Sequence, residues 1–372
     1  MRVFVGCYTK KISDELVGKG KGIYFFEFDS TKGQLKLVEI IPALNPSYLM
    51  VSKDKNYLYA VEEIALKESP KIKSFKIESD GNNSILTLIS EQNLPGAYAC
   101  HLNLSNSQTH LIVACYMSGN ALVYPLGDKG RILPCTQIIQ HKGKGPNLIR
   151  QEAAHTHMIC AFRSNGIFIV DLSLDLAKAY ILESSGRHFI ESPELDISIS
   201  KGAGARHMAL HPNGNFAFVF SELTAELFSY KLIDNIFKPL EVLPTLPDDF
   251  DNIPSGAAIR IHPNGNFLYV SNRGADSITI FRFDIESEKL LFLCCKPSGG
   301  KTPREINIDP TGQWLLVANQ DSDNIVVFSI NQKTGLLRNH SVNTELNSPS
   351  CIQFIEDIIL PNIQHQAKIH PL

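Results

Sequence analysis

Two apolar stretches around a tight turn form the clearest local pattern in the chain, at residues 206–222. The segment reads R-H-M-A-L-H-P-N-G-N-F-A-F-V-F-S-E. His207–His211 is typical of one strand, and Phe216–Phe220 is an apolar run typical of a second. An Asn-Gly pair between two such runs is the strongest short-range signal of a β-hairpin. The pattern therefore predicts two antiparallel strands with Arg206 and Glu222 at the same open end.

The same hairpin pattern recurs along the chain. The residues at its turn entrances are Ser52, Ser105, His211, His262 and Asp309. The intervals are 53, 106, 51 and 47 residues, so the doubled one indicates a further, degenerate unit near residue 158. A third and a fourth strand follow the hairpin, as at Ser277–Asp284 and Leu290–Cys295. Repeats of about 40–50 residues with four strands are typical of a β-propeller.

The two ends of the chain complete one unit. Near the N-terminus, a single strand at Val3–Tyr8 precedes Gly22–Asp29, and the missing strand is available at Ser350–Ile355. Seven four-stranded antiparallel blades then fit, with one blade split between the termini so that the ring closes without a free sheet edge. We therefore expect an all-β fold, a seven-bladed propeller forming a single domain over residues 1–372. The fourth blade, at about residues 148–184, is expected to be shortened or irregular, because only two strands are evident after His157.

Composition narrows the class of protein without changing this picture. The chain of 372 residues is 44% hydrophobic and 20% charged, which is ordinary for a globular protein, and its net charge of -3 gives no sign of a nucleic-acid or membrane partner. No apolar stretch approaches the ~20 residues that span a bilayer. The eight cysteines are scattered, without a Cys-x-x-Cys pair, which favours a reducing, cytoplasmic location. We expect a monomer or a weak homo-oligomer.

Charged and histidine side chains gather where the hairpins end. The first two strands of a blade lie nearest the central channel of a propeller, so these ends should converge on one mouth of the channel. The converging residues are Arg206, Arg273, Arg304, Glu62, Glu222, His101, His207 and Tyr116, together with Arg150–His157 of the degenerate unit. Several guanidinium groups at one mouth would bind a carboxylate or phosphate bidentately, and a histidine within reach could activate water as a general base.

Two other interpretations of these residues stay open. Polar residues at the ends of inner strands often only bridge neighbouring blades. His155 and His157 lie two residues apart, so on a strand they would face the same side, where Glu152 could complete a metal site with them. Since no further ligand is spaced with them, we expect no metal.

Several short motifs resemble one known family. They are V-G-C-Y-T at Val5–Thr9, N-P-S-Y-L at Asn45–Leu49, R-Q-E-A-A-H-T-H at Arg150–His157, G-A-R-H at Gly204–His207, and L-Y-V-S-N-R-G-A-D-S-I at Leu268–Ile278. Together they resemble the seven-bladed lactonase propellers, a family that includes propeller-type 6-phosphogluconolactonases and carboxy-cis,cis-muconate cyclases. The resemblance implies the opening of a sugar lactone without a required cofactor.

The resemblance also implies a set of site residues. The catalytic group would be His155, His157, Arg206, Glu222 and Arg273. From the convergence of the hairpin ends, we expect the residues that bind a small anionic lactone to be Arg150, Glu152, His101, His207, Arg304, Asn319 and Gln320. The expected reaction is hydrolysis of 6-phosphogluconolactone, a step of the pentose phosphate pathway, by base-activated water. The alternatives are another lactone or a muconate-type cyclic ester, or a non-catalytic propeller that binds small anions or a protein, which a shortened fourth blade would favour.

Overall fold

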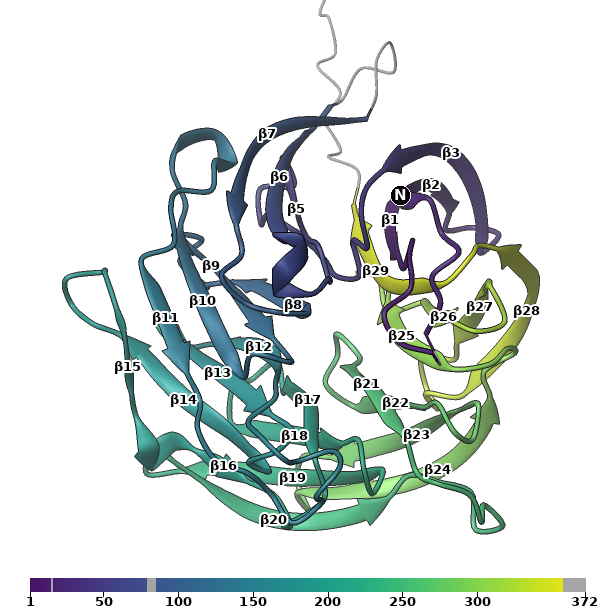
Figure 1. The fold of residues 1–372 in the computed structure, drawn as a ribbon. Coiled ribbons are helices and arrows are strands. Elements are labelled where there is room, and N and C mark those ends of the chain that lie inside the picture. The colour runs from purple at the N-terminus through teal and green to yellow at the C-terminus, as the bar shows by residue number, and fades with distance from the viewer. Residues whose placement is uncertain (15, 79–84, 357–372) are drawn as a thin grey trace, which may run out of the picture.

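The computed structural model describes residues 1–14, 16–78 and 85–356, and the strands in these ranges form seven antiparallel sheets arranged as a ring (Figure 1). Blade 1 contains β29 (Pro349–Ile355), β1 (Arg2–Cys7), β2 (Gly22–Asp29) and β3 (Gln34–Pro42) from the centre outward. Blade 2 contains β4 (Leu49–Val51), β5 (Tyr57–Val61), β6 (Lys71–Ile77) and β7 (Leu86–Asn93). Blade 3 contains β8 (Ala99–Leu104), β9 (His110–Cys115), β10 (Asn120–Pro125) and β11 (Gln137–Gln140).

The remaining blades follow in chain order. Blade 4 contains β12 (Thr156–Phe162), β13 (Gly166–Asp171), β14 (Leu176–Leu182), β15 (Phe189–Glu191) and β16 (Ile197–Ser198). Blade 5 contains β17 (Ala205–Leu210), β18 (Phe216–Ser221), β19 (Glu226–Ile233) and β20 (Ile236–Pro244). Blade 6 contains β21 (Gly256–Ile261), β22 (Phe267–Asn272), β23 (Ser277–Asp284) and β24 (Lys289–Pro297). Blade 7 contains β25 (Pro303–Ile308), β26 (Trp314–Asn319), β27 (Asn324–Ile330) and β28 (Leu337–Glu345).

Short helices are a minor part of the described chain. They are the 3₁₀ turns η1 (Leu66–Glu68), η2 (Asp128–Gly130) and η3 (Pro193–Leu195). Among the residues that are placed, no helix has the length and apolar character needed to cross a membrane. The expected all-β propeller is thus confirmed.

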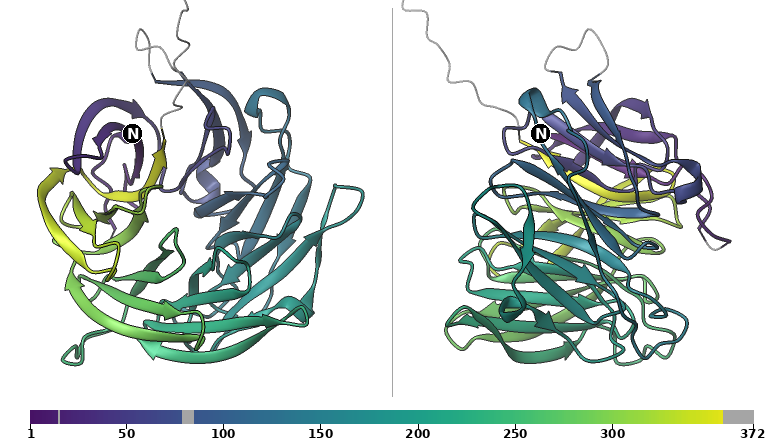
Figure 2. Two further views of the ribbon diagram at one scale, coloured as in Figure 1. Left: turned by 180° about the vertical axis from the view of Figure 1, so that it is seen from behind. Right: turned by 60° about the vertical axis from the view of Figure 1, so that its left-hand side comes forward.

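The ring closes through the first blade, as the sequence predicts. β1 pairs with β2 on one side and with β29 on the other, so Phe4 lies opposite both Phe25 and Gln353. The inner strands β29, β4, β8, β12, β17, β21 and β25 contact one another in a closed circle (Figures 1 and 2). Closure removes the free edge that an open stack of sheets would expose.

The fourth blade does not lack a strand, which corrects the expectation of a shortened unit. Leu176–Leu182 forms β14, the third strand of the blade. The outer position is divided between β15 and β16, which both pair with β14. These two pieces contain only 3 and 2 residues, too short for a strand pattern to be recognised, so the irregularity lies at the outer edge and away from the channel.

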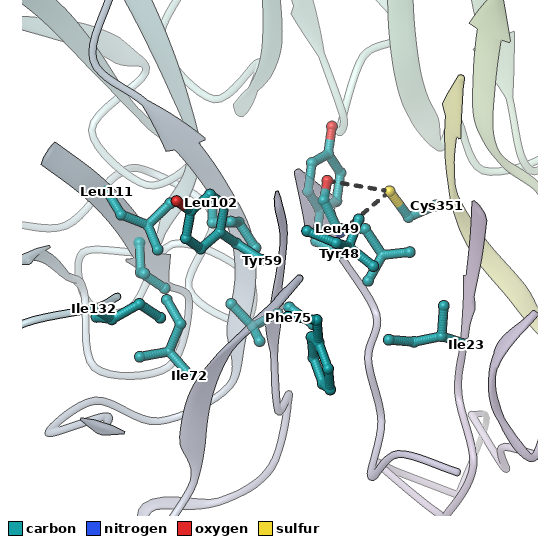
Figure 3. Packing of buried hydrophobic residues seen from close by; sticks show 14 of the residues in the cluster. Ile23, Tyr48, Leu49, Tyr59, Ile72, Phe75, Leu102, Leu111, Ile132 and Cys351 are labelled. Carbon is teal, nitrogen blue, oxygen red and sulfur yellow. Dashed lines mark hydrogen bonds between the residues drawn. The ribbon is translucent and has the colours of Figure 1, made fainter. Parts of the chain in front are cut away.

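Apolar side chains fill the spaces between neighbouring blades. The second strands are buried on both faces because they lie between two sheets, and every residue of β18 and of β26 is buried. Figure 3 shows one such interface, where Ile23, Tyr48, Leu49, Tyr59, Leu102 and Cys351 come from the first three blades. Burial of this kind contributes roughly 25 cal/mol per Å² of apolar surface and holds the blades at fixed spacing around the channel.

A β-bulge interrupts most inner strands close to the channel mouth. Pairing shifts between Ala99 and His101, between Thr156 and Met158, between Ala205 and His207, and between Pro303 and Glu305. The extra residues are Cys100, His157, Arg206 and Arg304. A bulge leaves its extra residue unpaired and re-aims that side chain, which is how these four reach the same end of the channel.

Candidate active site at the channel mouth

A cavity of about 460 Å³ opens at the end of the channel where the bulges lie. Bulged residues of blades 3, 4 and 7 contribute to its wall, and the long connection between β1 and β2 covers one side with Ile12, Ser13 and Leu16. The ionisable residues of the wall are Glu63, Tyr98, Cys100, Tyr116, Arg150, His157, Glu222, Arg273 and Arg304. A volume of this size suits a small-molecule ligand.

Three arginines converge on the carboxylate of Glu222. Arg206 Nε and Arg273 Nη2 each lie 2.9 Å from Glu222 Oε2, and Arg150 Nη2 contacts Oε1. Burial of Glu222 alone would raise its pKa, but the charges of Arg273, Arg150 and Arg206 hold that pKa well below its usual range. Glu222 is therefore an ionised, fully paired carboxylate whose role is to fix the guanidinium groups, and it is a poor proton acceptor.

Two of these arginines retain buried N–H groups without a partner. Arg206 Nη1 and Arg273 Nε make no hydrogen bond to any described residue. Burial, together with the charge of Arg273, lowers the pKa of Arg206 to about 10, so the group is still a cation at neutral pH. Leaving a buried donor unsatisfied costs on the order of 1–3 kcal/mol, so these groups are suited to receive an oxygen of a ligand or water.

His157 borders the cavity as a neutral imidazole. Its Nδ1 is buried and makes no hydrogen bond within the described ranges, and its ring lies 5.2 Å from that of His207. Burial lowers the pKa of His157 well below the usual value, and the nearby charge of Arg206 acts in the same direction. A neutral ring nitrogen next to a cavity can accept a proton from water.

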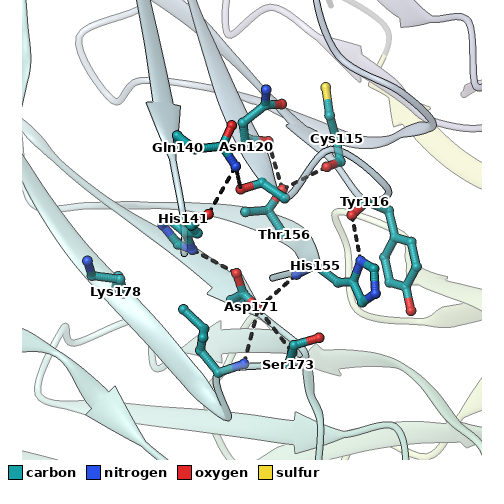
Figure 4. Close-up of polar contacts among 12 residues, drawn as sticks. Cys115, Tyr116, Asn120, Gln140, His141, His155, Thr156, Asp171, Ser173 and Lys178 are labelled. Carbon is teal, nitrogen blue, oxygen red and sulfur yellow. Dashed lines mark hydrogen bonds and ion pairs between the residues drawn. The ribbon is translucent and has the colours of Figure 1, made fainter. Parts of the chain in front are cut away.

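His155 is held away from the cavity. Its Nδ1 donates to the backbone oxygen of Tyr116 at 2.9 Å, its Nε2 lies 3.0 Å from Glu152 Oε1, and its ring stacks on the Tyr116 ring at 4.4 Å (Figure 4). The backbone N–H of His155 is fixed by Asp171, which also accepts a hydrogen bond from the N–H of Ser173. The bulge at His157 interrupts strand alternation, so the two histidines do not face the same side, contrary to the sequence prediction.

The remaining predicted residues lie behind or beside the cavity. His101 and His207 are buried further along the channel, where their rings lie 5.7 Å apart. Burial lowers the pKa of both. Asn319 donates to Ser298 O, in the connection between blades 6 and 7, and Gln320 donates to Oδ1 of the adjacent Asp321. The structure thus brings five predicted residues together in the cavity wall: Arg150, His157, Glu222, Arg273 and Arg304. Arg206 is buried behind the wall and binds Glu222. The predicted residues outside the wall are His101, His207, His155, Glu152, Asn319 and Gln320.

Sequence reasoning placed the wrong glutamate of blade 2 at the mouth. Glu62 accepts hydrogen bonds from Lys73 Nζ and from the backbone of Lys71, whereas Glu63 borders the cavity. Glu63 accepts a hydrogen bond of 2.9 Å from the hydroxyl of Tyr8. The Glu62-Glu63 pair was the available signal. Both glutamates follow the end of β5 at Val61, where strand pairing no longer determines which side chain faces the channel.

Metal chemistry has no visible support in the placed residues. They contain no group of three or more His, Cys, Asp and Glu side chains arranged to hold a metal ion. The proposed His155, His157 and Glu152 set is divided, because His157 faces the cavity while His155 bonds to Glu152 outside it.

A closed ring of seven blades with a basic, histidine-containing channel mouth defines the class, and comparison with known proteins gives the family. Residues 2–354 match the lactonase family of seven-bladed β-propellers, and the chain belongs to that family. A 6-phosphogluconolactonase of Bacillus subtilis (strain 168) is 32% identical over 365 residues, covering 95% of this chain and 98% of the relative. A 6-phosphogluconolactonase of Formosa agariphila is 32% identical over 307 residues, covering 81% and 84%.

A solved structure agrees with this assignment. The crystal structure of a candidate 6-phosphogluconolactonase from Bacteroides fragilis superposes with a TM-score of 0.86 at 26% identity. The match covers 95% of this chain and 98% of that one. The whole ring, and not only a few blades, is therefore shared.

Proposed function

We propose that this protein is a lactone hydrolase that converts 6-phosphogluconolactone to 6-phosphogluconate at the channel mouth. The observation that carries the proposal is a cavity lined by His157, Glu222 and Arg273, with Arg206 buried behind the wall against Glu222. His157 is neutral, and both Arg206 and Arg273 have a buried N–H group without a partner among the described residues. The names of the two relatives support the same substrate. The complete fourth blade removes the observation that favoured a non-catalytic propeller.

The charge of the mouth favours an anionic substrate. Among the described residues of the cavity wall, three guanidinium groups, those of Arg150, Arg273 and Arg304, stand against two carboxylates, those of Glu63 and Glu222. Like charges this close repel one another, so a bound anion is stabilised by the excess of guanidinium groups. A phosphate monoester has two negative charges over most of the neutral range and three acceptor oxygens, and it matches this excess better than a neutral sugar lactone.

The residues suit a water-addition mechanism. His157 accepts a proton as the water oxygen bonds to the lactone carbonyl carbon. The carbonyl oxygen becomes negative and receives hydrogen bonds from Arg206 Nη1 and Arg273 Nε. When the bond between that carbon and the ring oxygen breaks, the proton on His157 passes to the ring oxygen. The product acid releases its own proton to solvent.

The rate enhancements expected from a general base and oxyanion donors are sufficient for lactone hydrolysis. Sugar lactones already hydrolyse slowly in water, so the required reduction of the barrier is modest. A positioned base contributes roughly 100- to 10,000-fold, and one oxyanion donor roughly 100- to 1000-fold. Glu222 contributes indirectly, because its carboxylate holds Arg206 and Arg273 in one geometry before substrate arrives.

The proposal predicts that Arg206→Met abolishes most of the activity. Freshly prepared 6-phosphogluconolactone would be followed with 6-phosphogluconate dehydrogenase and NADP, with the uncatalysed rate subtracted. We expect kcat/KM to fall by roughly 100-fold or more, since an oxyanion donor is removed and Glu222 loses a partner. Circular dichroism and the unfolding midpoint of the variant would establish that it is folded. Wild-type rates equal to the blank would refute the proposal.

A further inference from the structure

Arg304 differs from the other arginines of the mouth. It is the bulged residue of β25 and borders the cavity. Arg150, Arg206 and Arg273 all bind Glu222, whereas the side chain of Arg304 makes no hydrogen bond or ion pair with any residue that the structure places. The guanidinium group lies instead over an aromatic ring, with Arg304 Cζ 5.1 Å from the centroid of the Tyr8 ring.

A guanidinium group held against a ring keeps its donors free. The face of the ring attracts the cation, while the N–H bonds lie in the guanidinium plane and point outward from its edge. Tyr8 is fully buried and is anchored by its hydroxyl, which donates to Glu63 at 2.9 Å. No ion pair joins Glu63 to Arg304 among the placed residues, so the carboxylate is engaged by Tyr8 and does not occupy the fork of Arg304.

The cavity therefore has two chemically different poles. One pole contains Glu222 with its arginines and His157, contributed by blades 4, 5 and 6. The other contains Tyr8, Glu63 and Arg304, contributed by blades 1, 2 and 7. A phosphorylated sugar lactone also has two poles, the carbonyl at one end of the carbon chain and the phosphate at the other.

We propose that Arg304, stacked on Tyr8, is the phosphate-binding and specificity-determining residue of this site. The phosphate oxygens pair with the free fork of Arg304, which directs the lactone carbonyl toward Arg206, Arg273 and His157. This assignment rests on the proposed lactonase function and adds which arginine selects a phosphorylated substrate. Tyr8 is a positioning residue, because it acts on the substrate only through Arg304.

The test compares two lactones in matched variants. Arg304→Met removes the charge and keeps much of the apolar stem. We expect kcat/KM for 6-phosphogluconolactone to fall about 100-fold, mostly through KM, and kcat/KM for unphosphorylated gluconolactone to change less than about threefold. Arg163→Met is the matched control, since Arg163 also stacks on a ring, at 4.7 Å from Phe162, and borders no part of this cavity.

A second pair of variants tests the role of Tyr8. Tyr8→Phe keeps the ring and loses the hydroxyl, whereas Tyr8→Leu removes the ring. We expect KM for the phosphorylated lactone to rise much more in Tyr8→Leu than in Tyr8→Phe, with kcat for gluconolactone similar in both. An equal rise in the two variants would overturn the positioning role.

The outcomes separate this inference from the proposed function. Equal losses of Arg304→Met on both lactones, or wild-type rates without preference for the phosphorylated one, would overturn the subsite while lactonase activity stands. If wild type hydrolyses neither lactone, the proposed function fails, and calorimetry with 6-phosphogluconate and gluconate then tests the subsite alone. We expect wild type to bind 6-phosphogluconate more tightly and Arg304→Met to lose about 100-fold in affinity. Unchanged affinity in the variant would refute the subsite.

Discussion

The arginines of the mouth favour opposite charge states in their two neighbours: Glu222 is ionised and His157 is neutral. The cations hold Glu222 ionised by lowering its pKa against the effect of burial. For His157, burial is the main cause of the lowered pKa and the charge of Arg206 adds to it, so the imidazole is neutral over the neutral range. In the proposed mechanism, His157 therefore transfers the proton and Glu222 fixes the guanidinium groups. A histidine of ordinary pKa at this position would be partly protonated near pH 6.5 and would lose function there.

The pH dependence of the rate follows from that assignment. In the proposed mechanism the neutral form of His157 is the active one. Its pKa is lowered by burial and by Arg206, so we expect activity to persist as pH falls through 6.5. We expect kcat/KM at about pH 6 to remain within about a factor of two of its value at pH 7.5. A pH-stat titration of the released acid measures this directly. Half-maximal activity at pH 6.5 or above would contradict a neutral, buried base.

The sequence predicts which side chains of an inner strand face the channel mouth only where no β-bulge interrupts the alternation of the strand. Sequence patterns placed Arg206, Glu222 and Arg273 at one mouth because hairpin turns fix which ends meet. They did not distinguish His157 from His155, because strict alternation gives both histidines the same face and the bulge between Thr156 and Met158 breaks it.

At the scale of elements, turns and buried carboxylates hold the mouth in shape. The hairpins place the predicted residues at one end of the channel, but the bulges shift their pairing, so that Ala205 and not Arg206 lies opposite Ser221. The bulge moves Arg206 out of the ladder. Long turns such as the β1–β2 connection contribute cavity residues that no strand pattern reveals.

Asp175 illustrates how a turn supports the site. Its buried carboxylate accepts hydrogen bonds from Gln151 Nε2 at 2.8 Å and from the N–H groups of Gly202 and Gly204 at 2.7 Å each. Gln151 follows Arg150 directly, and Gly204 lies two residues before Arg206. One carboxylate between β13 and β14 therefore fixes two segments that carry arginines of the mouth.

We expect Asp175→Ala to lower both stability and activity. Two buried donors and one partly buried donor lose their acceptor, which should reduce the free energy of unfolding by about 3 kcal/mol. The loosened arginines should also reduce kcat/KM. Urea unfolding and the coupled assay measure the two effects. Asp128→Ala, at an exposed aspartate, serves as control and should stay within about 0.5 kcal/mol of wild type. A fully active Asp175→Ala variant would contradict the supporting role.

At the scale of the whole molecule, the ring brings distant residues to one cavity. Arg304 and Tyr8 come from opposite ends of the chain and meet because β29 pairs with β1 and joins blade 7 to blade 2. The number of blades and the closure were predictable because hairpin spacing and the unpaired terminal strands are sequence features. The divided outer strand of blade 4 was not, since β15 and β16 are too short to leave a pattern.

The central claim is that the channel mouth hydrolyses a phosphorylated lactone with His157 as the base. The most direct measurement is kcat/KM for 6-phosphogluconolactone in wild type, His157→Gln and His155→Gln. We predict that His157→Gln loses roughly 100-fold or more while folding normally, and that His155→Gln, altered outside the cavity, loses less than about tenfold. Full activity in His157→Gln, or a greater loss in His155→Gln, would contradict it.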